Sequence, residues 1–247
     1  MTLPLTDLLV AQRARRVLID SLPDNLVPVD LAAAYQVQTE TALALGPVGA
    51  WKVSPFPASG EPLTAPIPRS AVFADKAVLD PAHFPAPGIE AEIAVTLNRD
   101  LRARETPYSG QDLSNAIGTL HLAIEVLSSR FANPSELPSL VAIADLQNNA
   151  GVIVGPARAV RDLPELAQQA MSMSVDGTEV GQVADGSTTE TVLRSLAWLA
   201  NHAAARGLAL KQGDVVITGA RIGALPLHGK TVLAESDGFE PVSATFQ

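Results

Sequence analysis

Residues 88–97 read GIEAEIAVTL, and from residue 89 onward an apolar side chain occupies every second position. An alternation with a period of two is typical of a β-strand, in which successive side chains point to opposite faces. One face of this strand is predicted to carry Ile89, Ala91, Ile93, Val95 and Leu97. The opposite face is predicted to carry Glu90, Glu92, Ala94 and Thr96. Two carboxylates are therefore expected side by side on the same face of one strand.

The rest of the chain adds further signals for short strands. Apolar runs of strand length occupy residues 120–127, 150–154 and 215–218. Residues 171–183 are typical of a hairpin around Asp176-Gly177, a pair that tight hairpin turns favour. Many short strands with few helices indicate an α+β fold, in which the sheet folds over on itself rather than alternating with helices.

Helical patterns occur near both ends of the chain. We expect one helix over residues 7–21 and a second over residues 30–45, with Asp30 as its N-cap. Residues 188–206 predict an amphipathic helix, and Gly207 is suited to the position just after its end.

The prolines divide the chain. Few glycines or prolines occur in the first 45 residues, whereas residues 46–87 are rich in proline, which excludes long helices and favours short strands joined by loops. We expect an N-terminal helical segment of residues 1–45 and a β-rich domain of residues 46–247.

Composition excludes several classes of protein. The 247 residues carry a formal net charge of −9 without clustered lysine and arginine, which argues against a nucleic-acid partner. The chain has no cysteine, so disulfides, thiolate nucleophiles and cysteine-bound zinc are excluded. No apolar run approaches the roughly 20 residues of a membrane span, and the N-terminus does not have the pattern of a signal peptide. A cytoplasmic protein is expected.

Three glutamates form the candidate chemical site. A solvated strand face is the simpler interpretation of Glu90 and Glu92 alone, since close carboxylates repel unless a proton or cation lies between them. Glu125 favours a site, because burying it unpaired within its apolar run would cost several kcal/mol. Its partner is expected to be Arg130, another basic group or a metal. Three carboxylates fit a hard divalent cation such as Mg²⁺ or Mn²⁺.

Two further segments are candidates for binding an anionic substrate. Lys52 lies in the short apolar strand VGAWKV, where it is either desolvated beside a substrate or a surface lysine that extends past Trp51. Thr218 and Gly219 end a predicted strand, where they either offer backbone N–H groups to an anion or simply form the turn.

Other catalytic patterns are missing from the sequence. The histidines show no metal-ligand spacing, and His202 is expected to be an ordinary residue on a helix face. The nucleophile elbow GxSxG, the Walker loop and the dinucleotide fingerprint GxGxxG do not occur, which argues against common hydrolases, NTPases and Rossmann enzymes.

Taken together, these segments resemble the fumarylacetoacetate hydrolase superfamily, in particular its 2-keto-4-pentenoate hydratase and 2-oxohex-3-enedioate decarboxylase branch. The resemblance covers nearly the whole chain and rests on GAWKV (residues 49–53), FAD (73–75), GIEAEIA (88–94), AIEVLSSR (123–130), LAWLAN (196–201), GDVVITGA (213–220) and VSATF (242–246).

The resemblance implies a mixed β-roll core with peripheral helices, assembled as an oligomer. It implies Mg²⁺ or Mn²⁺ held by Glu90, Glu92 and Glu125, with residues 46–247 as the catalytic domain. Catalytic residues would be Lys52 and Glu90, and substrate contacts would come from Lys52, Thr218 and Gly219. The reaction implied is the addition of water to a 2-hydroxy-2,4-dienoate or 2-oxo-enoate, giving a 4-hydroxy-2-oxo acid in aromatic catabolism.

Three alternatives stay open at this point. The chain could be a 2-oxo-enedioate decarboxylase, an acylpyruvate-type C–C hydrolase, or a non-catalytic subunit in a complex with a related pathway enzyme. A hydrolase is ranked below a decarboxylase because no histidine base stands near the motifs. Residues 144–151 (ADLQNNAG) depart from the Ala-Asp-Asn pattern usual in the family, so neither Asp145 nor Asn148 is assigned to the site.

Overall fold

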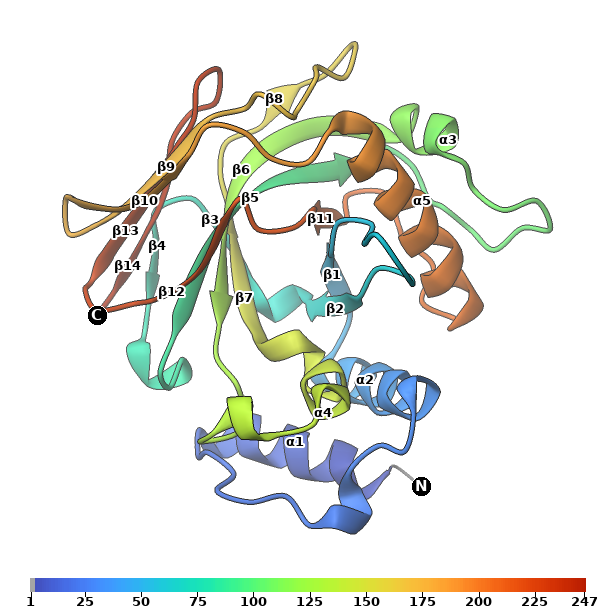
Figure 1. The fold of residues 1–247 in the computed structure, drawn as a ribbon, viewed down its shortest axis with the longest axis vertical. Helices are drawn as coiled ribbons and strands as arrows, with labels where there is room; N and C mark the ends of the chain where they lie inside the picture. Colours follow the sequence, from blue (N-terminus) through green and yellow to red (C-terminus); the bar gives the residue numbers. More distant parts are fainter. Residues whose placement is uncertain (1–2) are drawn as a thin grey trace.

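Two β-sheets organise the computed structural model, which describes residues 3–247 (Figure 1). The larger sheet contains β1 (Val48–Val53), β2 (Thr64–Pro68), β3 (Val72–Ala74), β5 (Gly88–Leu97), β6 (Ile117–Leu127), β7 (Asn149–Val154), β8 (Arg158–Ala159), β11 (Val215–Ile217) and β12 (Ile222–Pro226). The smaller sheet contains β4 (Ala77–Leu79), β9 (Met171–Val175), β10 (Thr178–Val183), β13 (Thr231–Glu235) and β14 (Val242–Phe246).

The helices lie around these sheets. The α-helices are α1 (Pro4–Arg15), α2 (Leu31–Leu45), α3 (Gly110–Ser114), α4 (Ser139–Ala144) and α5 (Thr189–Ala205). Short 3₁₀ turns occupy Asp24–Leu26, Arg69–Ala71, Pro81–His83, Pro134–Glu136 and Leu146–Asn148. None of the helices within residues 3–247 combines the length and the apolar character needed to cross a membrane.

The larger sheet is mixed and curls on itself. Its order is β2-β1-β11-β5-β6-β7-β3, in which β1 pairs parallel to β11 and β3 parallel to β7 while β5 and β6 are antiparallel. The edge strand β2 packs against β7 near the far end of that order, which closes the sheet into a roll. This confirms the α+β fold with a mixed β-roll core.

The alternation along β5 separates two buried faces. Ile89, Ala91, Ile93, Val95 and Leu97 all join the main hydrophobic core, which also contains residues of α5 and the smaller sheet. Ala94 faces the other way, into a smaller cluster inside the roll with Ala123 of β6 and Ile217 of β11. The predicted division of faces is therefore confirmed, and the glutamates lie on the face that the roll encloses.

The N-terminal helix begins and ends earlier than predicted. It spans Pro4–Arg15 rather than residues 7–21, because Pro4 is suited to the first helical turn and Arg16 adopts the left-handed conformation that ends it. Beyond it, Ile19 pairs with the segment after β6: its N–H donates to Arg130 O (2.8 Å), and its carbonyl accepts from Ala132 N–H (3.0 Å).

Other local predictions are confirmed. Asp30 caps α2 by accepting the Ala33 N–H (2.8 Å), and α5 ends at Ala205 with Gly207 at φ +74°. The hairpin β9–β10 turns at Asp176 and Gly177, both with positive φ, the geometry that a tight hairpin turn requires.

Helices α1, α2 and α4 form one layer below the larger sheet (Figure 1). Gln38 of α2 ties this layer to the roll, because its amide donates to Thr64 O of β2 (2.9 Å) and to Ile143 O of α4 (2.8 Å). Leu9 of α1 shares a small core with Val141 of α4. The division of the chain at residue 45 stays a prediction.

Candidate metal centre

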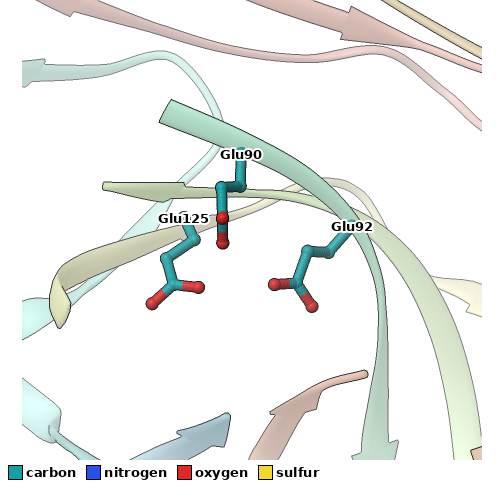
Figure 2. Close-up of side chains that lie close together, drawn as sticks. All are labelled: Glu90, Glu92 and Glu125. Carbon is teal, nitrogen blue, oxygen red and sulfur yellow. The ribbon is translucent and has the colours of Figure 1, made fainter. Parts of the chain in front are cut away.

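Glu90 and Glu92 of β5 and Glu125 of β6 converge inside the roll (Figure 2). Glu90 lies directly opposite Glu125 in the antiparallel ladder, and side chains of such cross-strand pairs share a face. One oxygen from each of the three carboxylates lies within 4.8 Å of the others. The pairing register of two strands thus assembles residues that are about 35 positions apart in the chain.

The cluster is not a solvated strand face. Glu92 is 2% exposed and Glu125 is 0% exposed, while Glu90 is partly buried. The simpler interpretation of the Glu-x-Glu pair is therefore wrong, because the curl of the sheet covers the face that alternation alone would leave open to water.

Lys52 is the basic partner of Glu125. Its Nζ lies 2.7 Å from Glu125 Oε1, and only 14% of the lysine side chain is exposed. The neighbouring Trp51 points into the main core, so Lys52 points into the roll. A surface lysine extending past Trp51 is thus excluded, and so is Arg130 as the partner: the Arg130 guanidinium lies 3.8 Å from Asp145 instead.

Burial and mutual repulsion raise the proton affinity of the cluster. Burial, then the charge of Glu125, raises the pKa of Glu90 to about 7. The same causes in the same order raise the pKa of Glu92 well above its ordinary value. Burial lowers the pKa of Lys52, but the charges of Glu125 and Glu90 outweigh it, and the net pKa is raised. The lysine therefore stays charged beside carboxylates that hold protons when no cation is present.

The donor set fits a hard divalent cation. One ammonium among three ionised carboxylates leaves two uncompensated negative charges in a buried space. Glu125 Oε2 is buried and accepts no hydrogen bond from any of residues 3–247, although Oε1 accepts from both Lys52 and Asn149. Oxygen donors alone are the ligands that Mg²⁺ and Mn²⁺ prefer.

Thr218 and Gly219 lie beside the cluster, but their donors are already engaged. The Thr218 hydroxyl donates to Ile93 O (2.8 Å), and the Gly219 N–H donates to Glu92 Oε2 (2.6 Å). Gly219 thus orients Glu92, a candidate metal ligand. The contact of Gly219 with substrate stays a prediction, and it requires the Gly219 N–H to be shared with Glu92 or released from it.

Asn149 is a site residue that sequence reasoning missed. Its amide donates to Glu125 Oε1 (2.8 Å). The backbone before Asn149 explains why: Leu146, Gln147 and Asn148 all have positive φ (54°, 53° and 59°), a left-handed turn that residue patterns do not indicate. Asn149 then faces Glu125, whereas the buried Asp145 points to Arg13 and Arg130. The signal in the sequence was that residues 144–151 could be matched to the family's Ala-Asp-Asn pattern in more than one register.

His121 and His202 have structural partners. His202 stacks on Trp198 with ring centroids 4.5 Å apart, and burial lowers its pKa to about 4, which confirms an ordinary packed residue. His121 lies on the glutamate face, but its ring nitrogens contact Thr96, Thr119 and the Gly155 carbonyl. Both roles are packing rather than proton transfer at the cluster.

The comparison with protein families decides the relationship. The model of the fumarylacetoacetate (FAA) hydrolase C-terminal family matches residues 42–246. The chain belongs to the fumarylacetoacetate hydrolase family. The matched range includes Lys52, all three glutamates and Gly219, so the candidate centre lies within the part of the chain that is shared by the family.

Relatives within the fumarylacetoacetate hydrolase family carry two kinds of name. A 2-keto-4-pentenoate hydratase of Burkholderia vietnamiensis is 33% identical over 184 residues, 71% of this chain and 68% of the relative. A 4-oxalocrotonate decarboxylase of a Pseudomonas species is 29% identical over 151 residues, 61% of this chain and 56% of the relative.

Solved structures share the fold. The 4-oxalocrotonate decarboxylase of Pseudomonas putida G7, complexed with magnesium and adipate, superposes with a TM-score of 0.85 at 24% identity and covers 99% of this chain and 97% of that one. The fumarylpyruvate hydrolase of Pseudomonas aeruginosa, in complex with Mn²⁺ and pyruvate, matches with a TM-score of 0.57 at 16% identity, covering 80% of this chain and 88% of that one.

The raised carboxylate pKa values predict an unusual pH dependence of stability. In the metal-free folded state Glu90 binds its proton more tightly than in the unfolded chain, so the contribution of Glu90 to the free energy of unfolding should fall as pH rises from about 4.5 to about 7. Urea denaturation of EDTA-treated protein across this range measures the slope. Glu90→Gln should make the slope of stability against pH more positive than in wild type, and equal slopes for the two proteins would contradict the assignment.

Gly219→Ala is predicted to destabilise the turn beside Glu92. Gly219 has φ +106°, and an added Cβ would lie 2.5 Å from Pro55 Cδ, so we expect a loss of about 1–3 kcal/mol. Gly223→Ala is the matched control, because an added Cβ there meets nothing within 4 Å. Equal urea midpoints for the two variants would refute the prediction.

Proposed function

We propose that this chain is a metal-dependent hydratase that adds water to a 2-hydroxy-2,4-dienoate or 2-oxo-enoate to give a 4-hydroxy-2-oxo acid, as in the meta-cleavage catabolism of aromatic compounds. The observation that carries the proposal is the convergence of three carboxylates within 4.8 Å beside a buried lysine. The resemblance to 2-keto-4-pentenoate hydratases supports this reaction.

Glu90, Glu92 and Glu125 would hold Mg²⁺ or Mn²⁺. When bound, the cation supplies Lewis acidity to a 2-oxo acid, which makes the conjugated alkene electrophilic toward water. The protein contributes the rest of the site. Asn149 and Lys52 hold Glu125 in place through Oε1, and the Gly219 N–H holds Glu92, so the carboxylates are oriented before substrate arrives.

Lys52 and Glu90 are the proposed catalytic residues. The Lys52 ammonium places a positive charge inside the roll, where it attracts the substrate carboxylate and stabilises negative charge that develops on the substrate. Glu90 is the most exposed of the three carboxylates, so it is the one most accessible to substrate and water for accepting or returning a proton.

Decarboxylation of a 2-oxo-enedioate is the second candidate. It is favoured by the relatives named 4-oxalocrotonate decarboxylase and by the match of that fold over nearly the whole chain. In this reaction the C–C bond to the departing CO₂ breaks, and the electron pair is delocalised onto the 2-oxo group and then takes a proton. An acylpyruvate-type hydrolase ranks lower, since His121 and His202 are both engaged in contacts within the fold.

One pair of assays separates the candidates. With Mg²⁺ or Mn²⁺, a hydratase consumes the dienol absorbance of 2-hydroxypenta-2,4-dienoate without releasing CO₂. A decarboxylase instead releases CO₂ from 2-oxohex-3-enedioate. Activity that survives complete chelation would contradict the metal proposal, and inactivity on both substrates together with co-purification of a second chain would favour a non-catalytic subunit.

The proposal includes self-association. We infer a homo-oligomer from the resemblance to the fumarylacetoacetate hydrolase family, which implies one, and the exposed apolar side chains Val29 (88%), Val78 (62%) and Leu43 (59%) are available for contacts between copies. Light scattering coupled to size exclusion tests it, and a mass of one chain at micromolar concentration would refute it.

A further inference from the structure

A second cavity lies on the opposite side of β7 from the glutamates. Its volume is about 470 Å³, and it is bounded by the end of α1, by β3 and β4, and by Ser129 and Arg130 after β6. Asn149 of β7 faces Glu125, whereas the adjacent Ala150 lines this cavity. The described lining includes none of the three glutamates and not Lys52, so the cavity is separate from the metal centre.

The inner end of the cavity carries excess positive charge. Arg13 and Arg130 share one carboxylate: Arg13 Nη2 lies 3.4 Å from Asp145 Oδ1, and Arg130 Nε lies 3.8 Å from Asp145 Oδ2. The Asp145 carboxylate also accepts the backbone N–H of Arg130 (2.9 Å). Burial, then the nearby charge of Arg130, lowers the pKa of Arg13 to about 10, which leaves the Arg13 guanidinium charged near neutral pH.

Several donors at this end lack acceptors. The Arg130 side chain is 9% exposed, yet its Nε and Nη2 form no hydrogen bond with any described residue, and the same holds for Arg13 Nε. Buried guanidinium N–H groups are costly when unpaired. Asp80, the acidic residue of the described lining, does not supply the missing acceptor, because it pairs with Arg16 (3.3 Å) and His83 (3.3 Å).

Part of the remaining wall is apolar, and Gln12, Ser70 and Ser129 add polar groups. Phe73, Leu79 and Phe84 line the cavity beside Pro85 and Ala150. Small-molecule sites typically combine such walls with a few convergent polar groups, in volumes of about 300–1,000 Å³. A carboxylate accepts two parallel hydrogen bonds from a guanidinium, and an apolar body would cover the aromatic walls.

We propose that this cavity binds a small organic anion with one carboxylate on a compact apolar body, the carboxylate meeting Arg130 and Arg13 and the body lying against Phe73 and Phe84. The site does not depend on the metal centre and adds a second ligand to the protein besides its substrate. Benzoate is the probe, and benzamide is its neutral counterpart of the same shape.

Calorimetric titration of the full-length protein without added metal tests the charge requirement. Benzoate should bind at least about tenfold more tightly than benzamide, and Arg130→Gln should weaken benzoate binding at least about tenfold. Arg102→Gln is the matched control, because that side chain is 85% exposed, and it should leave binding unchanged. Equal binding of benzoate and benzamide, or no benzoate binding, would overturn the proposal.

A crystal of the wild-type protein with 4-bromobenzoate keeps the test valid even if Arg130→Gln does not fold. Anomalous scattering should place bromine against the wall that Phe73 and Phe84 form, with the carboxylate toward Arg130. Bromine found only beside Glu90, Glu92 and Glu125, or a cavity filled by a side chain of a neighbouring copy, would refute the site.

Discussion

Glu92→Gln is expected to lower kcat/KM of the metal-dependent reaction by roughly 10³-fold, because a Lewis acid supplies several kcal/mol of transition-state stabilisation. The amide has nearly the shape of the carboxylate, and its oxygen can still accept the Gly219 N–H that now reaches Glu92 Oε2 at 2.6 Å. What it removes is one negative charge from a buried cluster of three. Glu92→Gln should therefore weaken metal binding while leaving the fold unchanged.

Three measurements test this expectation together. Calorimetry with Mn²⁺ should show weakened binding, the dienol assay should show the lost activity, and circular dichroism should show an unchanged fold. Glu179→Gln makes the same chemical change on the exposed strand β10 and should behave as wild type. Full activity of Glu92→Gln would remove the basis of the proposed function.

Lys52→Met is expected to destabilise the metal-free protein by about 3–5 kcal/mol at neutral pH, the usual cost of removing one partner of a buried ion pair. The pair joins Lys52 Nζ to Glu125 Oε1 at 2.7 Å, and Glu125 is fully buried. Without the ammonium, three carboxylates face one another with no cation, so the loss should grow as pH rises and they ionise. Added Mg²⁺ should restore part of the stability, because it would neutralise the same carboxylates that Lys52 neutralises.

Urea denaturation with and without Mg²⁺ measures these effects. Lys230→Met is the matched control, since Lys230 is exposed and its removal should change the free energy of unfolding by less than about 0.5 kcal/mol. A metal-free Lys52→Met protein as stable as wild type would show that the lysine does not balance the charge of Glu125.

The site shows where reasoning from the sequence ends. Glu125 in an apolar run had to have a partner, and three kinds were open, including Arg130, which is only five residues away. The structure selects Lys52, which is 73 residues away, because β1 and β11 bring it onto the glutamate face. Proximity along the chain was the wrong guide, since Arg130 turns out of the roll toward Asp145.

The helices also differ in how well the sequence predicts them. Residues 31–45 could be predicted closely, because Asp30 supplies a side-chain cap that acts within three residues. The end of α1 could not, because the chain leaves the helix at Arg16, in the left-handed conformation, and then pairs Ile19 with Phe131, a contact between distant parts of the chain.

Local chemistry thus set the strand alternation of β5, the caps and turns, and the presence of paired carboxylates in a chain without thiols, since each depends on residues within a few positions of one another. Tertiary structure alone decided that the glutamate face is enclosed, that Lys52 and Asn149 are the partners of Glu125, and that two arginines share Asp145 beside a second cavity. The physical reason is that burial and charge pairing depend on which strands pack together in the roll. The spacing of residues along the chain does not determine their distances in the folded protein.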